Sequence, residues 1–214
     1  MTKRDPDQTR QGILAAAFTE IHRQGFQAAS LANILADTGL TKGALYHHFP
    51  DKKALGLAVV EDVVRPRLVA AMIEPVRSAA RPLAALRAVI ELRRDEATDA
   101  GVALGCPVNN LMQEMSPLDE DFRAALTAIV ADWRDVLTAA LARARGGGEI
   151  RADVDPAAAA LFIVSGMWGC VGVAKSLQSA AAYRACLGQL ATYLDTLSSQ
   201  SQENGHGSDR DPSP

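Results

Sequence analysis

Between positions 41 and 52, polar and small residues have the types and the spacing needed to contact a DNA duplex. A threonine at a helix start can bind a phosphate together with the helix N–H groups, and lysine and tyrosine side chains can donate to further phosphates. A glycine lets the helix backbone approach the groove closely, and a histidine can contact a base edge or the backbone. The candidate DNA-binding residues are Thr41, Lys42, Gly43, Tyr46, His47 and Lys52. A surface helix with merely solvated lysine and histidine side chains is the alternative.

A cysteine ahead of a proline, in Gly105-Cys106-Pro107, is the second reactive feature. Proline favours the first position of a helix, so Cys106 is predicted to be the N-cap of a short helix, 107–115. The unsatisfied N–H groups and the positive end of the helix would favour the thiolate and raise its reactivity. The alternative is that Cys106 is a small buried residue without reactivity.

Polar side chains follow Cys106 within the same short helix. Their amide groups can orient a polar ligand in an apolar pocket, or can instead cap and bridge neighbouring helices. The polar set is Asn109, Asn110, Gln113 and Glu114, and the candidate pocket walls are Met72, Met112 and Trp133. The remaining cysteines, Cys170 and Cys186, have apolar neighbours and are interpreted as core residues.

Two short helices joined by a tight turn must position the DNA-contacting residues. The first begins after Ser30 as N-cap and ends at Gly39, which can adopt the left-handed conformation that the turn needs. The second, 41–48, begins at Thr41 and is closed by Pro50. A preceding helix, ended by Gly25, completes this module. The apolar residues expected to pack against that helix are Leu31, Ile34, Leu35, Leu40, Leu45 and Phe49.

The rest of the chain is predicted to be helical, with no segment that reads as a strand and no internal repeat. Asp51 caps a long helix that reaches about Arg77 and is interrupted near Pro66 or Pro75. The later helices are predicted over 82–100, 107–115, from Ser116-Pro117 to Arg145, from Asp155-Pro156 to Leu177, and 180–197. Gly146-Gly147-Gly148 is a clear break.

Composition and charge place limits on the class of protein. Hydrophobic residues make up 48% of the 214, enough for a sizeable core, and three cysteines without a secretory signal favour a cytoplasmic protein. The net charge of −3 divides unevenly, with +2 over residues 1–53 and −5 over the remainder. Basic charge therefore leans toward the end that carries the candidate DNA contacts.

An uncharged stretch, 157–174, is nearly long enough to span a membrane. Alanine and glycine make it weakly hydrophobic, and no basic cluster flanks it, so a buried interface helix is preferred. Gly166, Gly169 and Gly172 weaken this helix unless a neighbouring backbone packs closely against it. Phe162, Met167 and Trp168 are expected to be interface or core residues.

The segments LANILADTGL and TKGALYHHFPDKKAL closely resemble the DNA-binding module of the TetR family of repressors, over residues 10–56. The resemblance implies an all-α fold of about nine helices, a homodimer and a palindromic DNA operator. It also places Thr41, Lys42, Gly43, Tyr46, His47 and Lys52 at the DNA-contacting positions of the family. Members of the family pair their last two helices into a four-helix bundle, here 156–177 and 180–197.

The segment GCPVNNLMQEMSPLDEDFRAAL, with Lys175 further on, resembles a subgroup of TetR repressors that respond to electrophiles, oxidants or acrylate-type small acids. The resemblance implies that Cys106 is a modifiable sensor and Lys175 its electrostatic partner. We expect a DNA-binding domain over 1–53, a ligand-sensing and dimerisation domain over 54–197 and a disordered tail over 198–214.

The predicted function is a repressor that an effector releases from DNA by favouring its non-binding state. The alternatives are a thiol-dependent enzyme and a helical interaction module that does not bind DNA. No Ser-His-Asp order, phosphate-binding glycine loop or metal-spaced cluster appears in the sequence, so no cofactor or metal is expected.

Overall fold

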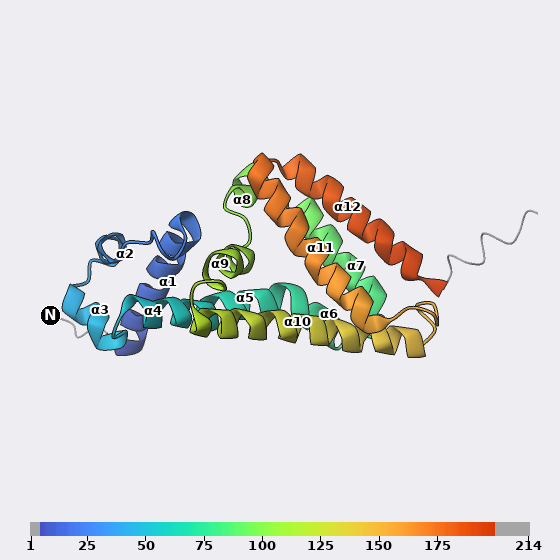
Figure 1. Ribbon diagram of the computed structural model, residues 1–214, viewed down its shortest axis with the longest axis horizontal. Helices are drawn as coiled ribbons and strands as arrows, with labels where there is room; N and C mark the ends of the chain where they lie inside the picture. The colour runs from blue at the N-terminus through green and yellow to red at the C-terminus, as the bar shows by residue number, and fades with distance from the viewer. Residues whose placement is uncertain (1–4, 200–214) are drawn as a thin grey trace, which may run out of the picture. The chain divides into compact units, whose positions relative to one another are not determined.

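The computed structural model describes residues 5–199, which fold into helices and connecting turns (Figure 1). The segments are α1 (Pro6–Gln24), α2 (Leu31–Thr38), α3 (Lys42–His48), α4 (Lys52–Val59), η1 (Val60–Val64), α5 (Arg65–Leu68), η2 (Val69–Ile73), α6 (Glu74–Arg77), α7 (Pro82–Asp95), α8 (Asp99–Ala103), α9 (Pro107–Met115), α10 (Glu120–Gly146), α11 (Pro156–Leu177) and α12 (Ala180–Leu197). An isolated β-bridge joins Ile150 to Ser198. The expected all-α fold is confirmed.

The predicted long fourth helix is an uninterrupted run of five segments, from α4 to α6. Its α-helical turns alternate with the π-helical turns η1 and η2, next to Pro66 and Pro75. Proline has no N–H to donate, and a wider π turn lets the helix continue past that missing bond. If this run is counted as one helix and the single turn α8 is set aside, the described residues hold nine helices, as expected.

The helix starts predicted from capping residues are mostly confirmed. Ser30, Thr41, Asp51 and Asp155 each accept a hydrogen bond from a backbone N–H of the helix that follows. Gly39 ends α2 with a φ of 64°, the left-handed conformation expected of it. Short-range chemistry therefore determines where most of these helices begin and end.

The first helix begins at Pro6, because Asp5 accepts a hydrogen bond from a backbone N–H of its first turn. Two predicted helix boundaries were wrong. The long helix predicted from Ser116-Pro117 begins at Glu120, because the Asp119 carboxylate caps it. The helix predicted over 82–100 is divided into α7 and α8, and the Thr98 hydroxyl caps the new turn.

Cys170 is a core residue as interpreted, at 3% exposure, whereas Cys186 is half-buried, and the sequence did not predict that the two are bonded. The two cysteines form a disulfide between α11 and α12, with their Cα atoms 5.5 Å apart. Only the antiparallel packing of the two helices brings these residues, 16 positions apart in sequence, within bonding reach.

The chain forms two compact units, each built from separate stretches of sequence. The first unit extends through Val69 and includes Leu104–Val130, while the second holds Ala70–Ala103 and continues from Ala131. In the first unit α1 packs against α2, α4 and η1, and α9 also packs against η1. Of the expected core, Ile34, Leu45 and Phe49 are buried, whereas Leu31, Leu35 and Leu40 are half-buried.

An aromatic contact joins the two stretches of the first unit. The rings of Phe26 and Phe122 lie 4.6 Å apart between centroids. Gly56 of α4 lies under both rings, where a Cβ atom would come within 2.4 Å of Phe26 and 2.8 Å of Phe122. Only glycine fits at this point, so the close approach of α4 depends on it.

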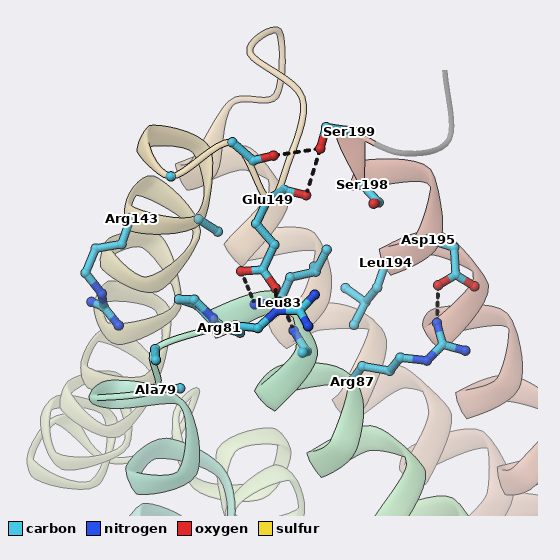
Figure 2. A pocket seen from close by; sticks show the side chains of 16 residues that line it. Ala79, Arg81, Leu83, Arg87, Arg143, Glu149, Leu194, Asp195, Ser198 and Ser199 are labelled. Carbon is cyan, nitrogen blue, oxygen red and sulfur yellow. Dashed lines mark hydrogen bonds and ion pairs between the residues drawn. The ribbon is translucent and has the colours of Figure 1, made fainter. Parts of the chain in front are cut away.

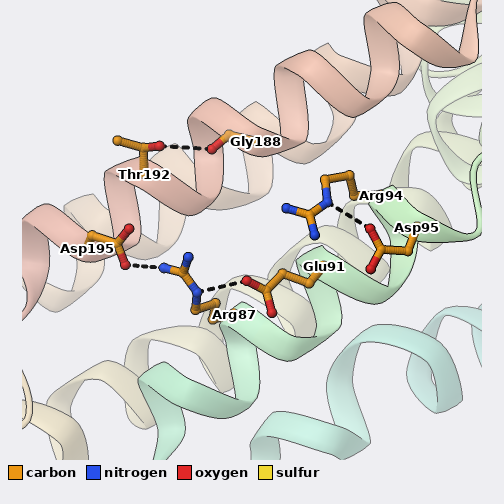
Figure 3. A network of polar contacts seen from close by, with 7 residues as sticks. All are labelled: Arg87, Glu91, Arg94, Asp95, Gly188, Thr192 and Asp195. Atoms are coloured by element: carbon orange, nitrogen blue, oxygen red, sulfur yellow. Dashed lines mark hydrogen bonds and ion pairs between the residues drawn. The ribbon is translucent and has the colours of Figure 1, made fainter.

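In the second unit α12 packs against both α7 and α11. The Trp133 and Trp168 rings meet edge to face at 5.1 Å and join α10 to α11 within the core. At the surface, Arg87 of α7 pairs with Glu91 on its own helix and with Asp195 on α12 (Figure 3). These exposed pairs add little to stability beyond orienting the helices.

Glu20 of α1 fixes the start of α2 within the first unit. Its carboxylate, 7% exposed, accepts hydrogen bonds from the Ser30 backbone N–H (3.1 Å) and from the Asn33 side-chain amide (2.8 Å). These two hydrogen bonds, the Ser30 bond first, lower the pKa of Glu20. Because the folded-state pKa is depressed, this stabilisation is present above the unfolded pKa and is lost as the pH falls through the folded value.

We expect Glu20→Gln to lower the free energy of unfolding at pH 7 by about 1–3 kcal/mol, since hydrogen bonds to a charged acceptor are replaced by weaker ones. The difference from the wild type should shrink as the pH falls below about 4.5. Urea unfolding across this pH range measures both effects. Glu61→Gln, which removes an exposed ion pair with Arg65, is the control and should cost at most about 0.5 kcal/mol. An equal difference at pH 7 and at low pH would contradict the assignment.

Candidate nucleic-acid interface and sensor residues

The short helix α3 has one buried and one exposed side. Leu45 is fully buried and Phe49, at the end of the helix, is 3% exposed. The opposite side is polar and reaches solvent, with Tyr46 39% exposed and His47 also exposed. The remaining exposed candidates, at the start of the helix, are Thr41, Lys42 and Gly43. Five of the six predicted DNA contacts therefore lie together on one accessible surface.

Lys42 and Tyr46 support each other on that surface. The Lys42 ammonium lies 5.7 Å from the centre of the Tyr46 ring, within the range of a cation–π contact. The contact holds a positive charge and a phenol O–H on the same side of α3. Both groups are donors that suit phosphate oxygens.

Lys52, the sixth predicted contact, is half-buried and points toward the end of α1. Its ammonium donates to the Gln27 backbone carbonyl at 2.9 Å and lies 5.0 Å from the centre of the Phe26 ring. An ammonium has three N–H donors, so this bond leaves two for a phosphate. Lys52 thus links the turn after α1 to the predicted DNA surface.

Cys106 is the N-cap residue of α9 and Pro107 is the first helical residue, as the sequence predicts. Cys106 is half-buried and lies outside the disulfide, and its thiol makes no capping hydrogen bond. The Asn110 amide donates across this helix start to the Leu104 carbonyl at 2.7 Å. Asn110 therefore has a structural role here, the alternative that the sequence left open.

Glu114 is a functional candidate whose partners the sequence could not identify. Its carboxylate accepts hydrogen bonds from the backbone N–H groups of Phe26 and Gln27, each at 2.8 Å. Gly25 precedes them with a φ of 82°, and a Cβ atom there would lie 3.0 Å from the Glu114 oxygens. Near the other end of α9, His22 Nε2 lies 2.9 Å from the Gly105 carbonyl oxygen. The cysteine-bearing segment is thus bonded to α1 at two points.

The predicted sensor residues are distributed between the two units. The first unit contains Cys106, Asn109, Asn110, Met112 and Gln113, and the second contains Met72, Trp133 and Lys175. Met72 and Trp133 are 7% and 2% exposed, while Cys106 and Lys175 are half-buried. The pairing of Cys106 with Lys175 stays a prediction.

A pocket of about 630 Å³ lies in the second unit, where the start of α7 meets the ends of α10 and α12 (Figure 2). Its walls include Arg81, Arg87 and Arg143, but none of the predicted sensor residues. The Glu149 carboxylate accepts hydrogen bonds from the N–H groups of Leu83 and Ala84 and so occupies the start of α7. Part of this pocket therefore serves to cap a helix.

The helix α11 contains the apolar stretch that raised a membrane alternative. By length and composition it can cross a membrane, and 44% of its most apolar window is buried inside the protein. Met167 and Trp168 belong to that buried part, at 5% and 8% exposure. Leu161 and Phe162, at 53% and 54%, lie on an exposed side of the same helix.

Comparison with known proteins covers both parts of the chain. The family model described as bacterial regulatory proteins, tetR family, matches residues 13–59, and the tetracyclin repressor-like C-terminal domain model matches residues 82–190. The transcriptional regulator AcuR of Cereibacter sphaeroides is 32% identical over 174 residues, which cover 80% of this chain and 78% of AcuR.

Two further relatives agree. The HTH-type transcriptional repressor DhaR of a Mycobacterium species is 24% identical over 169 residues, covering 76% of this chain and 80% of DhaR. A crystal structure of a TetR transcriptional regulator from Chloroflexus aurantiacus superposes with a TM-score of 0.81 at 26% identity, covering 92% of this chain and 98% of that one. The chain belongs to the TetR family, and it is a DNA-binding transcriptional regulator and not an enzyme.

Proposed function

We propose that the protein is a homodimeric repressor that binds a palindromic DNA operator and is released by a small-molecule or thiol-reactive effector. The observation that carries this proposal is the polar, exposed side of α3, opposite the buried Leu45. The DNA contacts assigned to this surface are Thr41, Lys42, Gly43, Tyr46, His47 and Lys52. A two-fold dimer would place two such helices about 34 Å apart, in successive major grooves.

The exposed side of α11 supports the proposed dimer. Leu161, Phe162, Val173 and Leu177 are 53–62% exposed on this helix. Apolar side chains grouped in this way usually mark an interaction surface. A Cβ atom at Gly169 would have no neighbour within 4 Å, so a partner backbone can approach there. The proposed dimer uses α11 and α12 of both chains.

The proposed sensor is Cys106, with Lys175 as its electrostatic partner. The amides assigned to a non-covalent effector are Asn109, Asn110 and Gln113, of which Asn109 and Gln113 share one face of α9. Asn110 also donates to the Leu104 carbonyl. The proposed walls are Met72, Met112 and Trp133. Within the described residues the buried Trp133 Nε1 has no hydrogen-bond partner. An orphaned N–H costs about 1–3 kcal/mol, which an effector oxygen would recover.

Glu114 supports a direct route from the sensor segment to the DNA-binding helices. The carboxylate on α9 bonds to the two residues that follow α1, and Gln27 in turn accepts from Lys52. Lys53 adds ion pairs to Asp119 and Asp121 at 2.8 and 2.7 Å, between α4 and the start of α10. A shift of α9 after modification of Cys106 would therefore move the end of α1 and loosen the position of Lys52.

We also propose the domain boundaries that the sequence predicts, and a cytoplasmic location. Residues 1–53 are assigned to DNA binding, and 54–197 to sensing and dimerisation. The proposed tail, 198–214, lies outside the described residues from position 200 onward. The stretch 104–130, packed into the first compact unit, is the part of the sensing domain that would transmit the effector response.

Tyr46→Phe and Lys52→Ala should weaken binding to all duplex sequences about equally, because each removes a phosphate contact. Only Lys52→Ala, which removes a positive charge, should also reduce the salt dependence. His47→Ala should instead change the preference between sequences by about 1–3 kcal/mol. Binding-site selection followed by titration at several salt concentrations measures both effects. Arg134→Ala, an exposed arginine of the second unit paired with Asp135, is the matched charge control. The reverse pattern would overturn these roles, and a protein that ignores duplexes at low ionic strength would overturn the proposed function.

Cys106 should react with a maleimide faster than a model thiol at pH 7, and its alkylation should release bound DNA. Cys106→Ser should retain DNA binding and lose the release. Lys175→Met should slow the reaction of Cys106, whereas Lys175→Arg, which keeps the charge, should leave the reaction at the wild-type rate. Mass spectrometry gives the rate and a fluorescence anisotropy assay gives the release. Reaction no faster than the model thiol would contradict the sensor assignment.

Glu114→Gln should expose the amides of Phe26 and Gln27 to faster hydrogen exchange, because one of the two carboxylate acceptors becomes an N–H donor. Release of DNA by Cys106 alkylation should also be weakened, since α9 loses its hold on α1. Gln113→Ala, an exposed neighbour on the same helix, is the control and should leave the exchange of both amides unchanged. Unchanged exchange in the Glu114 variant would rule out this route.

A further inference from the structure

The disulfide between Cys170 and Cys186 lies within the pair of helices assigned to dimerisation. Cys170 of α11 is 3% exposed and Cys186 of α12 is half-buried. Cys186 is therefore the more accessible residue of the pair. Neither residue takes part in the sensor proposed at Cys106, which lies in the first unit.

The bond is one step in a regular series of contacts along α11 and α12, which lie side by side (Figure 1). Every fourth residue of α11 faces α12, as expected for one side of a helix. The facing pairs are Phe162–Tyr193, Gly166–Leu190 and Cys170–Cys186, and Ala174 shares an apolar cluster with Ala180 at the start of α12. The residue numbers rise on α11 as they fall on α12, which is the order of antiparallel helices.

The other contacts of this series are non-covalent, and apart from the aromatic pair they join small or aliphatic side chains. A Cβ atom at Gly166 would lie 3.2 Å from Leu190 Cδ1, and Ala174 and Ala180 share a small apolar cluster. The Phe162 and Tyr193 rings meet at 4.7 Å. Small side chains allow α11 to slide or turn against α12 at modest cost, whereas a covalent bond does not. The disulfide therefore fixes the register of the two helices.

The register of α11 and α12 also determines the surface proposed for dimerisation. Phe162 belongs both to the contact between the two helices and to the exposed surface, because it contacts Tyr193 on α12 and is still 54% exposed. Breaking the Cys170–Cys186 bond would free Phe162 and Tyr193 to move relative to Leu161 and Val173. The surface formed by the two helices would then be less preorganised for binding a second copy of the chain.

We propose that Cys170 and Cys186 form a reversible redox site, oxidised by a peroxide and reduced by a dithiol, whose oxidised form stabilises the dimer and so strengthens operator binding. This inference rests on the proposed homodimer. It adds a second thiol response of opposite sign to the release of DNA proposed for Cys106.

The chemistry needs only the two thiols, a peroxide and a reductant. The more accessible Cys186 thiolate attacks one peroxide oxygen, breaks the O–O bond and becomes a sulfenic acid, while the leaving oxygen takes up a proton as an alcohol or water. The Cys170 sulfur then attacks the Cys186 sulfur, the S–S bond forms, and water leaves with the sulfenic oxygen and two protons. A dithiol reverses the change by becoming a disulfide itself and returning two thiols.

The test uses the full-length Cys106→Ser protein, so that only this pair responds. Samples treated with dithiothreitol or hydrogen peroxide are alkylated and weighed, and should carry two labels or none, respectively. Sedimentation velocity at decreasing concentration should show several-fold weaker dimerisation after reduction. The melting temperature should fall on the order of 5–10 °C, as expected for opening a loop of this size. Operator affinity should fall with the dimer.

The variants Cys170→Ala and Cys186→Ser in the same background should resemble the reduced sample and should no longer respond to peroxide. If either variant is unstable, the reversible cycle of the Cys106→Ser protein alone is decisive. Equal dimer affinity in the oxidised and reduced samples, or a bond that dithiothreitol does not open in the folded protein, would overturn the inference. A protein that is monomeric and does not bind DNA in either state would instead overturn the proposed function.

Discussion

The burial of Leu45 is the constraint on which the proposed DNA-binding surface depends. With only seven residues, α3 has two turns, so its single fully buried side chain determines which way the helix faces. Because Leu45 is buried, the side of α3 that carries Tyr46 and His47 is the one that reaches solvent. The orientation of α3 therefore depends on ordinary hydrophobic burial, which a polar residue at position 45 would not provide.

Carboxylates from elsewhere in the chain hold the ends of the short helices around this core. Glu20 binds the backbone at the start of α2, and Glu114 binds the backbone just after α1. Each meets N–H groups that a helix or turn leaves without an internal partner. Such bonds are strong because they are charged, yet each depends on the position of one side chain. The end of α1 is thus well ordered and at the same time sensitive to a movement of α9.

The features that the sequence predicted are those decided within a few residues. Ser30, Thr41 and Asp155 cap the helices that follow them, and Gly39 makes the left-handed turn, because each acts on its immediate neighbours. The Ser116 start failed although its local pattern was good, since Asp119 offers a stronger acceptor one turn later. Boundaries of this kind depend on a competition that the pattern alone does not resolve.

Long-range partners were beyond prediction from a single sequence. Glu114 lies 88 positions from Phe26, and the pairing of Cys170 with Cys186 requires the antiparallel register of α11 and α12 to be known first. These contacts are the ones through which regulation is proposed to act. In the proposed homodimer, operator binding would need both a correctly held α3 and a fixed spacing of the two chains. The proposed thiol near α1 and the thiol pair between α11 and α12 would therefore influence the same equilibrium from different sides. By linkage, a bound operator would in turn favour the state of each thiol site that favours DNA binding. DNA would then act as an effector of both thiol sites.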